Sequence, residues 1–203
     1  MTRYNEVLDS LRTAYDGGAA DRERSEKPEW KRQERETFLE RLRAEDCQRL
    51  LEVGAGTGQD SAFFLHEGLD VLATDLSPVM VAHCRAKGVD ARVADFLNLE
   101  VPPASFDAVY AFNCLLHVPN TDLSAALEAI QTVMKPGGLF FLGVYRGRGH
   151  EGPLERDDHV PWRFFSWCTD EQIQRFTSRY FETVDFHVVE SANFQSLTLR
   201  RPR

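Results

Sequence analysis

The stretch Leu50-Leu51-Glu52-Val53-Gly54-Ala55-Gly56-Thr57-Gly58 decides the fold of this chain. An apolar run ends in an acid and then passes through three glycines at alternate positions. Because glycine lacks a Cβ, such a loop can turn tightly and let a ligand lie against the backbone. Placed between a buried strand and a helix, it suits a nucleotide-like molecule. A dinucleotide fingerprint would need its third glycine at position 59, where Gln59 stands instead.

Composition narrows the class of protein. The chain has 203 residues, is 42% hydrophobic and carries a formal net charge of −8, which predicts one domain, 1–203, with a sizeable core. The negative charge disfavours nucleic acid as a substrate. No stretch is apolar enough to span a bilayer or to serve as a secretory signal, so we expect a cytoplasmic protein without a membrane partner. Four widely spaced cysteines favour neither a metal site nor a disulfide framework.

Apolar runs and helix signals alternate through the middle of the chain, in residues 47–145. Strands are predicted at 49–53, 69–74, 91–93, 106–112 and 138–145, with helices at 60–67, 78–87 and 123–134. This alternation indicates βαβ units and a parallel sheet. Ser77 and Pro78 are typical of a helix start, and Thr121 or Asp122 is expected to cap the helix after strand 106–112.

The two flanks are organised differently. Residues 1–46 predict two helices separated by a break at 15–18. Residues 146–167 are rich in Gly, Pro, charge and aromatics and predict a long irregular loop. A helix at 169–180, capped by Thr169 or Asp170, and a hairpin at 183–190 and 195–200 complete the chain.

Further motifs follow the glycine loop in a fixed order. Asp75 ends the second strand 21 positions after Gly54, where a nucleotide-binding fold places an acid that binds ribose hydroxyls. Asp95 and Phe96 follow the third strand, and a Pro-Gly-Gly turn precedes the fifth. Together these segments, from Leu50 to Leu142, resemble the class I S-adenosylmethionine-dependent methyltransferases.

The resemblance implies a Rossmann-like α/β fold with a seven-stranded, mostly parallel sheet of order 3-2-1-4-5-7-6, strand 7 being antiparallel. It implies S-adenosylmethionine as cofactor and S-adenosylhomocysteine as product. Glu52 would then face the amino acid moiety, Asp75 the ribose, Asp95 the adenine amino group and Phe96 the adenine ring. The full set of cofactor contacts that it implies is Tyr15, Glu52, Gly54, Ala55, Gly56, Gly58, Asp75, Leu76, Met80, Asp95, Phe96, Ala111 and Phe112.

The acceptor side is less determined. His117, after the fourth strand, is the first candidate for a catalytic base, and the alternatives are Tyr145, His150, Asp157, Asp158 and His159. The substrate-binding candidates on the long loop are His150, His159, Trp162 and Phe164. We expect a small-molecule acceptor with an O or N nucleophile, although a halide or thiol acceptor, which needs no base, stays open. The protein is expected to be a monomer or homodimer.

Two other classes of function are considered. A non-catalytic S-adenosylmethionine-binding or scaffold protein would keep the same cofactor residues. A nicotinamide-dependent oxidoreductase is disfavoured by the glycine spacing and by the lack of a Tyr-x-x-x-Lys pair.

Overall fold

A central seven-stranded sheet organises the computed structural model, which describes residues 1–155 and 157–203. Its order is β3-β2-β1-β4-β5-β9-β8, in which β9 is antiparallel to both neighbours and the β1–β5 pairings are parallel. The strands are β1 (Arg49–Val53), β2 (Asp70–Asp75), β3 (Asp90–Val93), β4 (Phe106–Phe112), β5 (Met134–Tyr145), β8 (Glu182–Val189) and β9 (Phe194–Arg200). The predicted fold class and strand order are confirmed.

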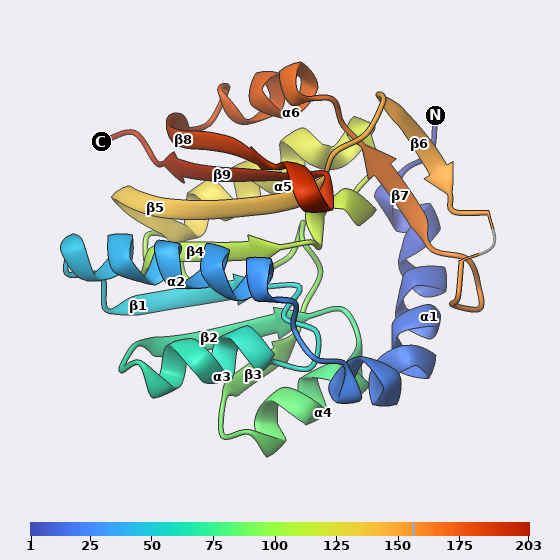
Figure 1. Cartoon of the computed structure of the whole chain (residues 1–203), viewed down its shortest axis with the longest axis horizontal. Coiled ribbons are helices and arrows are strands. Elements are labelled where there is room, and N and C mark those ends of the chain that lie inside the picture. Colours follow the sequence, from blue (N-terminus) through green and yellow to red (C-terminus); the bar gives the residue numbers. More distant parts are fainter. Residues whose placement is uncertain (156) are drawn as a thin grey trace.

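Helices cover both faces of the sheet (Figure 1). They are α1 (Tyr4–Arg24), α2 (Glu29–Ala44), α3 (Gln59–His66), α4 (Pro78–Ala86), α5 (Asn120–Val133) and α6 (Asp170–Thr177), with short 3-10 turns η1 (Leu115–His117) and η2 (Glu190–Ala192). Successive residues of β1 serve opposite faces, as strand geometry requires. Leu50 belongs to the buried cluster of α2 and α3, whereas Leu51 belongs to the cluster that includes α1 and α5.

Local signals explain several helix ends. The Ser77 hydroxyl accepts a hydrogen bond from the Met80 amide at 3.1 Å, and Pro78 occupies the first turn of α4. Thr169 and Gln172 form a capping box at the start of α6. Both predicted caps are therefore confirmed. The third is wrong, because α5 begins at Asn120 after Pro119, and Asp122 instead accepts the Tyr4 amide at 2.8 Å at the start of α1.

The predicted break at 15–18 is wrong, since α1 runs without interruption through both glycines of that segment. Glycine disfavours a helix only by about 1 kcal/mol relative to alanine, which packing can outweigh. Gly18 serves the packing here, because a Cβ at this position would lie 2.6 Å from Nε2 of His159. As Figure 1 shows, α1 lies at the carboxyl ends of the parallel strands, facing the glycine loop.

The prediction of an irregular loop at 146–167 is also wrong at both ends of the segment. Its flanks pair as an antiparallel hairpin of β6 (His150–Pro153) and β7 (Phe164–Trp167). Phe164 and Phe165 are buried in the core cluster, which anchors β7 beside η1. The hairpin therefore stands next to α1 at the carboxyl end of the sheet (Figure 1). Among the helices of residues 1–155 and 157–203, none has the length and apolar content needed to cross a bilayer.

Candidate functional site

A cavity of about 800 Å³ lies at the carboxyl ends of the parallel strands, between the sheet, α1 and the segment leading into β7. Ligands of open α/β sheets bind at this edge, where the strand order reverses. Ten of the thirteen predicted cofactor residues line it, namely Tyr15, Glu52, Gly54, Ala55, Gly56, Asp75, Leu76, Met80, Phe96 and Phe112. Gly58, Asp95 and Ala111 are not part of this lining.

Each of the three glycines of the loop has a positive φ, of +66° at Gly54, +57° at Gly56 and +79° at Gly58. They differ in what surrounds the missing Cβ. A Cβ at Gly54 would lie 2.4 Å from Cβ of Cys114, and one at Gly58 would lie 2.7 Å from Sγ of Cys84. The missing side chains at Gly54 and Gly58 therefore allow the loop to pack closely against Cys114 and Cys84. Only Gly56 has nothing within 4 Å of its missing Cβ, so it leaves open backbone for a ligand.

Two carboxyl groups line the cavity from neighbouring strand ends, Glu52 being buried and Asp75 half-buried. Asp75 accepts the amides of Gly56 at 2.8 Å and Ser77 at 2.9 Å, and burial raises its pKa to about 6. Glu52 accepts the hydroxyl of Ser61, and burial, together with the negative charge of Asp60, raises its pKa. Neither forms a salt bridge with a cation among the residues described. This end of the cavity therefore favours a ligand that brings positive charge and hydroxyl groups.

The third strand end contributes an aromatic surface. Phe96 is half-buried, lines the cavity and lies 5.9 Å from the ring of Tyr4. Asp95 holds the turn instead, because its carboxylate accepts the amides of Leu97 at 2.7 Å and Asn98 at 3.1 Å. The stacking position predicted for Phe96 is therefore available, whereas the adenine contact of Asp95 stays a prediction.

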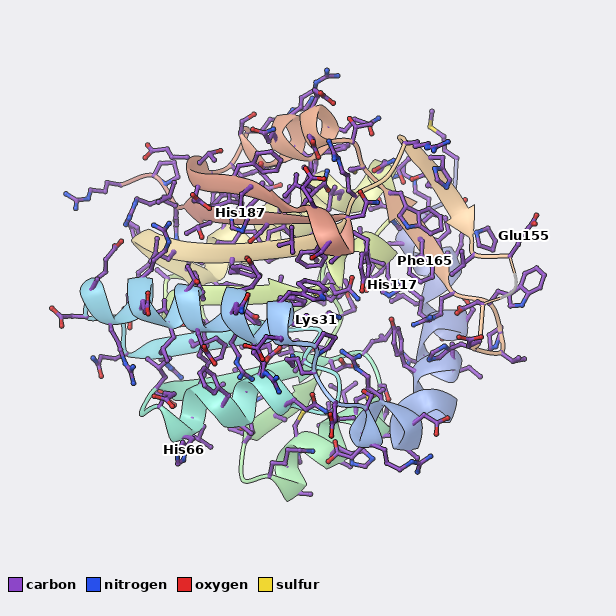
Figure 2. All side chains as sticks on the ribbon, viewed as in Figure 1. Lys31, His66, His117, Glu155, Phe165 and His187 are labelled. Atoms are coloured by element: carbon purple, nitrogen blue, oxygen red, sulfur yellow. The ribbon has the colours of Figure 1, made fainter. Side chains whose placement is uncertain are left out.

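A hydrogen-bonded cluster from three distant segments forms another part of the cavity wall. Tyr15 of α1 bonds through its hydroxyl to Nε2 of His117 in η1, and Nδ1 of His117 lies 2.7 Å from the carbonyl oxygen of Phe164. Arg163 donates from Nη1 to the Tyr15 hydroxyl at 3.3 Å. Figure 2 shows His117 beside Phe165, whose ring centroid is 4.7 Å away. His117 is thus at the cavity, but Tyr15 covers its free nitrogen.

The charges of this cluster are balanced within the protein. Asp157 accepts from Nε of Arg163 at 2.8 Å and from Nη2 at 2.7 Å. Although burial acts to raise it, these bonds hold the pKa of Asp157 well below its ordinary value. Burial lowers the pKa of His117 to about 4, so its imidazole is neutral at pH 7.

The four residues predicted on the loop to bind substrate lie in different environments. His159 lines the cavity and lies 5.8 Å from the ring of Tyr15. His150 is exposed and stacks on Trp167 at 4.6 Å, Trp162 is half exposed, and the side chain of Phe164 is buried in the core. Those three side chains do not line the cavity, because the hairpin turns them toward solvent or the core.

Arg163 and Asn113 are two residues of the cavity wall that sequence reasoning did not predict. Arg163 had no motif to mark it. Asn113, directly after β4, has a positive φ of +56° and a buried Oδ1 without a hydrogen-bond partner among the described residues. An Asn at a strand end was a usable signal, because this residue type tolerates the left-handed conformation.

Comparison with known proteins agrees with this geometry. A family model described as "Methyltransferase domain" matches residues 50–138. The structure of *Burkholderia thailandensis* 1,6-didemethyltoxoflavin-N1-methyltransferase, with its acceptor and S-adenosylhomocysteine bound, superposes with a TM-score of 0.76 at 21% identity, covering 100% of this chain and 92% of that one. Residues 50–138 therefore match a methyltransferase domain, and the whole chain shares the fold of that bacterial enzyme.

Curated proteins that are similar to this chain match over part of their length. Rice 24-methylenesterol C-methyltransferase 2 is 32% identical over 146 residues, which cover 62% of this chain and 40% of that protein. Ubiquinone biosynthesis O-methyltransferase of *Xanthomonas campestris* is 39% identical over 103 residues, which cover 47% and 42%. The chain thus spans about two fifths of these relatives. S-adenosylmethionine is the methyl donor of the enzymes that this chain resembles. The open backbone at Gly56 fits the part of that cofactor that lies along the glycine loop. The two carboxyl groups fit its cationic part, and Phe96 fits its aromatic part.

Proposed function

We propose that the protein transfers a methyl group from S-adenosylmethionine to an O or N nucleophile of a small-molecule acceptor. One observation carries this proposal. A single cavity joins the glycine-and-carboxylate end to the cluster of Tyr15, His117 and Arg163, so a donor at one end and an acceptor at the other would share one enclosed space.

The chemistry of the first end supports the donor. S-adenosylmethionine carries an ammonium, a sulfonium and two ribose hydroxyls. Glu52 and Asp75 offer carboxylate oxygens at adjacent strand ends, and hydrogen bonds to charged acceptors are stronger than neutral ones. Leu76, Met80 and Phe112 add apolar walls. The donor would therefore be held along the loop, with its charged parts near Glu52.

The second end supports an acceptor of limited size. The cavity volume of about 800 Å³ must hold both reactants, and ligand pockets commonly measure about 300–1,000 Å³. The net charge of −8 also disfavours a nucleic-acid acceptor. Relatives that act on ubiquinone precursors and sterols, as their names state, are consistent with a small acceptor here.

The protein's own contribution would be positioning and proton handling. The donor supplies an activated methyl group when bound, so the chain needs to align the nucleophile and exclude water. α1 covers the cavity from one side and Arg163 from another. His117, neutral and buried, is the group that can receive a proton at Nε2, in agreement with its proposed role as base.

Calorimetric titration of S-adenosylmethionine and S-adenosylhomocysteine into wild type and Asp75→Ala tests the donor. We expect saturable binding that weakens strongly in the variant. Release of S-adenosylhomocysteine with a library of small phenols and amines then tests turnover. Absence of binding would contradict the proposal, whereas tight binding without turnover of any acceptor would favour a non-catalytic, cofactor-binding role.

A further inference from the structure

We propose that Tyr15 is the residue that contacts the reacting nucleophile and that its oxygen accepts a hydrogen bond from the acceptor. The acceptor is therefore a protonated O–H or N–H group rather than a halide or thiolate. This inference rests on the proposed function and assigns a catalytic role to a residue expected only to contact the cofactor. It follows from the direction of three hydrogen bonds.

The first bond determines the tautomer of His117. Its Nδ1 lies 2.7 Å from the carbonyl oxygen of Phe164. A carbonyl oxygen can only accept, so Nδ1 must carry the hydrogen. In a neutral imidazole, the other nitrogen, Nε2, then presents a lone pair. Tyr15 bonds to His117, and the charged or titratable groups that act on the imidazole are Arg163, Asp157 and His159. Asp157 is paired with Arg163, so among the described residues it is not free to stabilise a charged imidazole.

The second and third bonds determine what Tyr15 presents to the cavity. Nε2 of His117 presents a lone pair, so the Tyr15 hydroxyl donates its single hydrogen to that nitrogen. Arg163 has only donors, and its Nη1 lies 3.3 Å from the same oxygen. The Tyr15 oxygen therefore has no hydrogen left to donate. Its remaining lone pair can only accept, and Tyr15 lines the cavity.

A lone pair at this place selects the acceptor. An O–H or N–H group of the acceptor can donate its hydrogen to the Tyr15 oxygen. This hydrogen bond leaves the lone pair of the acceptor atom directed elsewhere in the cavity. Iodide or a thiolate has no hydrogen to donate, so its negative charge would face the tyrosine lone pair. A repulsive contact of this kind is a strong basis for discrimination between these two classes of acceptor.

The proton balance is complete within the cluster. The acceptor lone pair forms the bond to the methyl carbon, and the electron pair of the broken carbon–sulfur bond stays on the sulfur of S-adenosylhomocysteine. The acceptor proton passes to the Tyr15 oxygen as the hydrogen of Tyr15 passes to Nε2 of His117. A weakly basic imidazole suffices, because methylation makes the acceptor proton strongly acidic as the bond forms.

The hydrogen-bond directions can be tested without any acceptor. Two-bond ¹⁵N–¹H spectra of ¹⁵N-histidine-labelled protein distinguish the two tautomers and the charged form. We expect His117 to be protonated at Nδ1 and neutral at pH 7, and its Nε2 signal to shift in Tyr15→Phe. A hydrogen on Nε2, or an Nε2 signal that Tyr15→Phe leaves unchanged, would overturn the proposal. Tyr180→Phe, outside the cavity lining, is the matched control.

Turnover provides the second readout. Phenols and N–H heterocycles are compared with iodide and thiophenol by release of S-adenosylhomocysteine. We expect turnover only with the first two classes, and a fall in kcat of about 10²–10⁴-fold in Tyr15→Phe, with the Kd for S-adenosylmethionine within twofold of wild type. Equal rates with iodide, or an unchanged kcat in Tyr15→Phe, would contradict it.

The two proposals fail in different ways. Absence of S-adenosylmethionine binding, or of product with every probe, would count against methyl transfer as such. In that case the spectra of His117 still decide which way Tyr15 points its hydrogen. Binding and turnover that do not depend on the Tyr15 hydroxyl would leave methyl transfer standing and remove only the role of Tyr15.

Discussion

The two ends of the cavity are built in opposite ways. The end proposed for the methyl donor, called the donor end below, comes from consecutive strand ends between Glu52 and Phe96, in one continuous part of the chain. The end proposed for the acceptor, called the acceptor end, joins Tyr15 to His117 across 102 positions and to Arg163 across 148. The first is therefore a property of local spacing, whereas the second exists only when α1, η1 and the approach to β7 meet.

The ends also differ in their electrostatics. Burial raises the pKa of the donor-end carboxyls Glu52 and Asp75, and neither forms a salt bridge among the described residues, although the charge of Lys27 acts on Glu52. At the acceptor end, the pKa of Asp157 is held low by Arg163, and His117 is neutral. The donor end consequently favours a cationic ligand, while the acceptor end is balanced before any ligand arrives. Four predictions test this contrast, from the largest expected effect to the smallest.

Gly54→Ala tests whether the donor end depends on close packing. The new Cβ would lie 2.4 Å from Cβ of Cys114 at a φ of +66°. Overpacking and left-handed strain together should lower the free energy of unfolding by about 2–5 kcal/mol, as measured by urea denaturation. Gly68→Ala, with a φ of +95° and nothing within 4 Å, is the control and should cost about 1–2 kcal/mol. Equal losses would show that strain alone, not the packing of the loop, is responsible.

His117 predicts a pH dependence of stability at the acceptor end. Its folded pKa of about 4 is below the unfolded value of about 6.5. Below pH 6.5 the unfolded chain binds a proton that the folded protein excludes, so stability falls as the pH drops from about 6.5 to 4, by up to about 3 kcal/mol. His117→Gln should lack this part of the decline in urea titrations across that range. The exposed His66→Gln should retain it, and identical pH profiles of wild type and His117→Gln would exclude a buried neutral imidazole.

Asp75→Asn tests the charge of the donor end while preserving its shape. The amide can still accept from Gly56 or Ser77 but no longer offers a carboxylate to a ribose. We expect S-adenosylmethionine affinity to fall about 10- to 100-fold in calorimetry, with little change in folding. Asp70→Asn, at the exposed opposite end of β2, should bind like wild type. A loss of less than threefold in Asp75→Asn would remove Asp75 from the cofactor contacts.

Glu52 predicts that donor binding, like the stability set by His117, increases as the pH rises. Because its pKa is raised, part of the ligand-free protein holds the neutral carboxyl near neutral pH. A cationic ligand requires the carboxylate, so S-adenosylmethionine affinity should rise about tenfold between pH 6 and 8, with proton release in calorimetry. Glu52→Gln should flatten this rise, whereas substitution of the exposed Glu128 of α5 by Gln should not. A rise that persists in Glu52→Gln would assign the proton to another group.

Prediction from sequence succeeded where residues close in the chain act together. The glycine loop, Asp75 and Phe96 were identified because each follows a strand at a recognisable spacing, and parallel strand ends meet at one edge of the sheet. It failed at residues 15–18 and 146–167, where glycine and proline content suggested irregular backbone. There, packing of Gly18 against His159 and burial of Phe164 outweighed local preference.

Local patterns in the sequence predicted the alternating strands and helices and the motifs from Glu52 to Phe96, because apolar periodicity and glycine spacing act over a few residues. The resemblance that those motifs carry implied the strand order and the kind of cofactor. Only the tertiary structure decided that Tyr15 covers His117, that Arg163 holds Tyr15 and Asp157 together, and that His150, Trp162 and Phe164 face away from the cavity. Those contacts join segments that are distant in sequence, and no local pattern encodes the direction in which a hydrogen bond between them points.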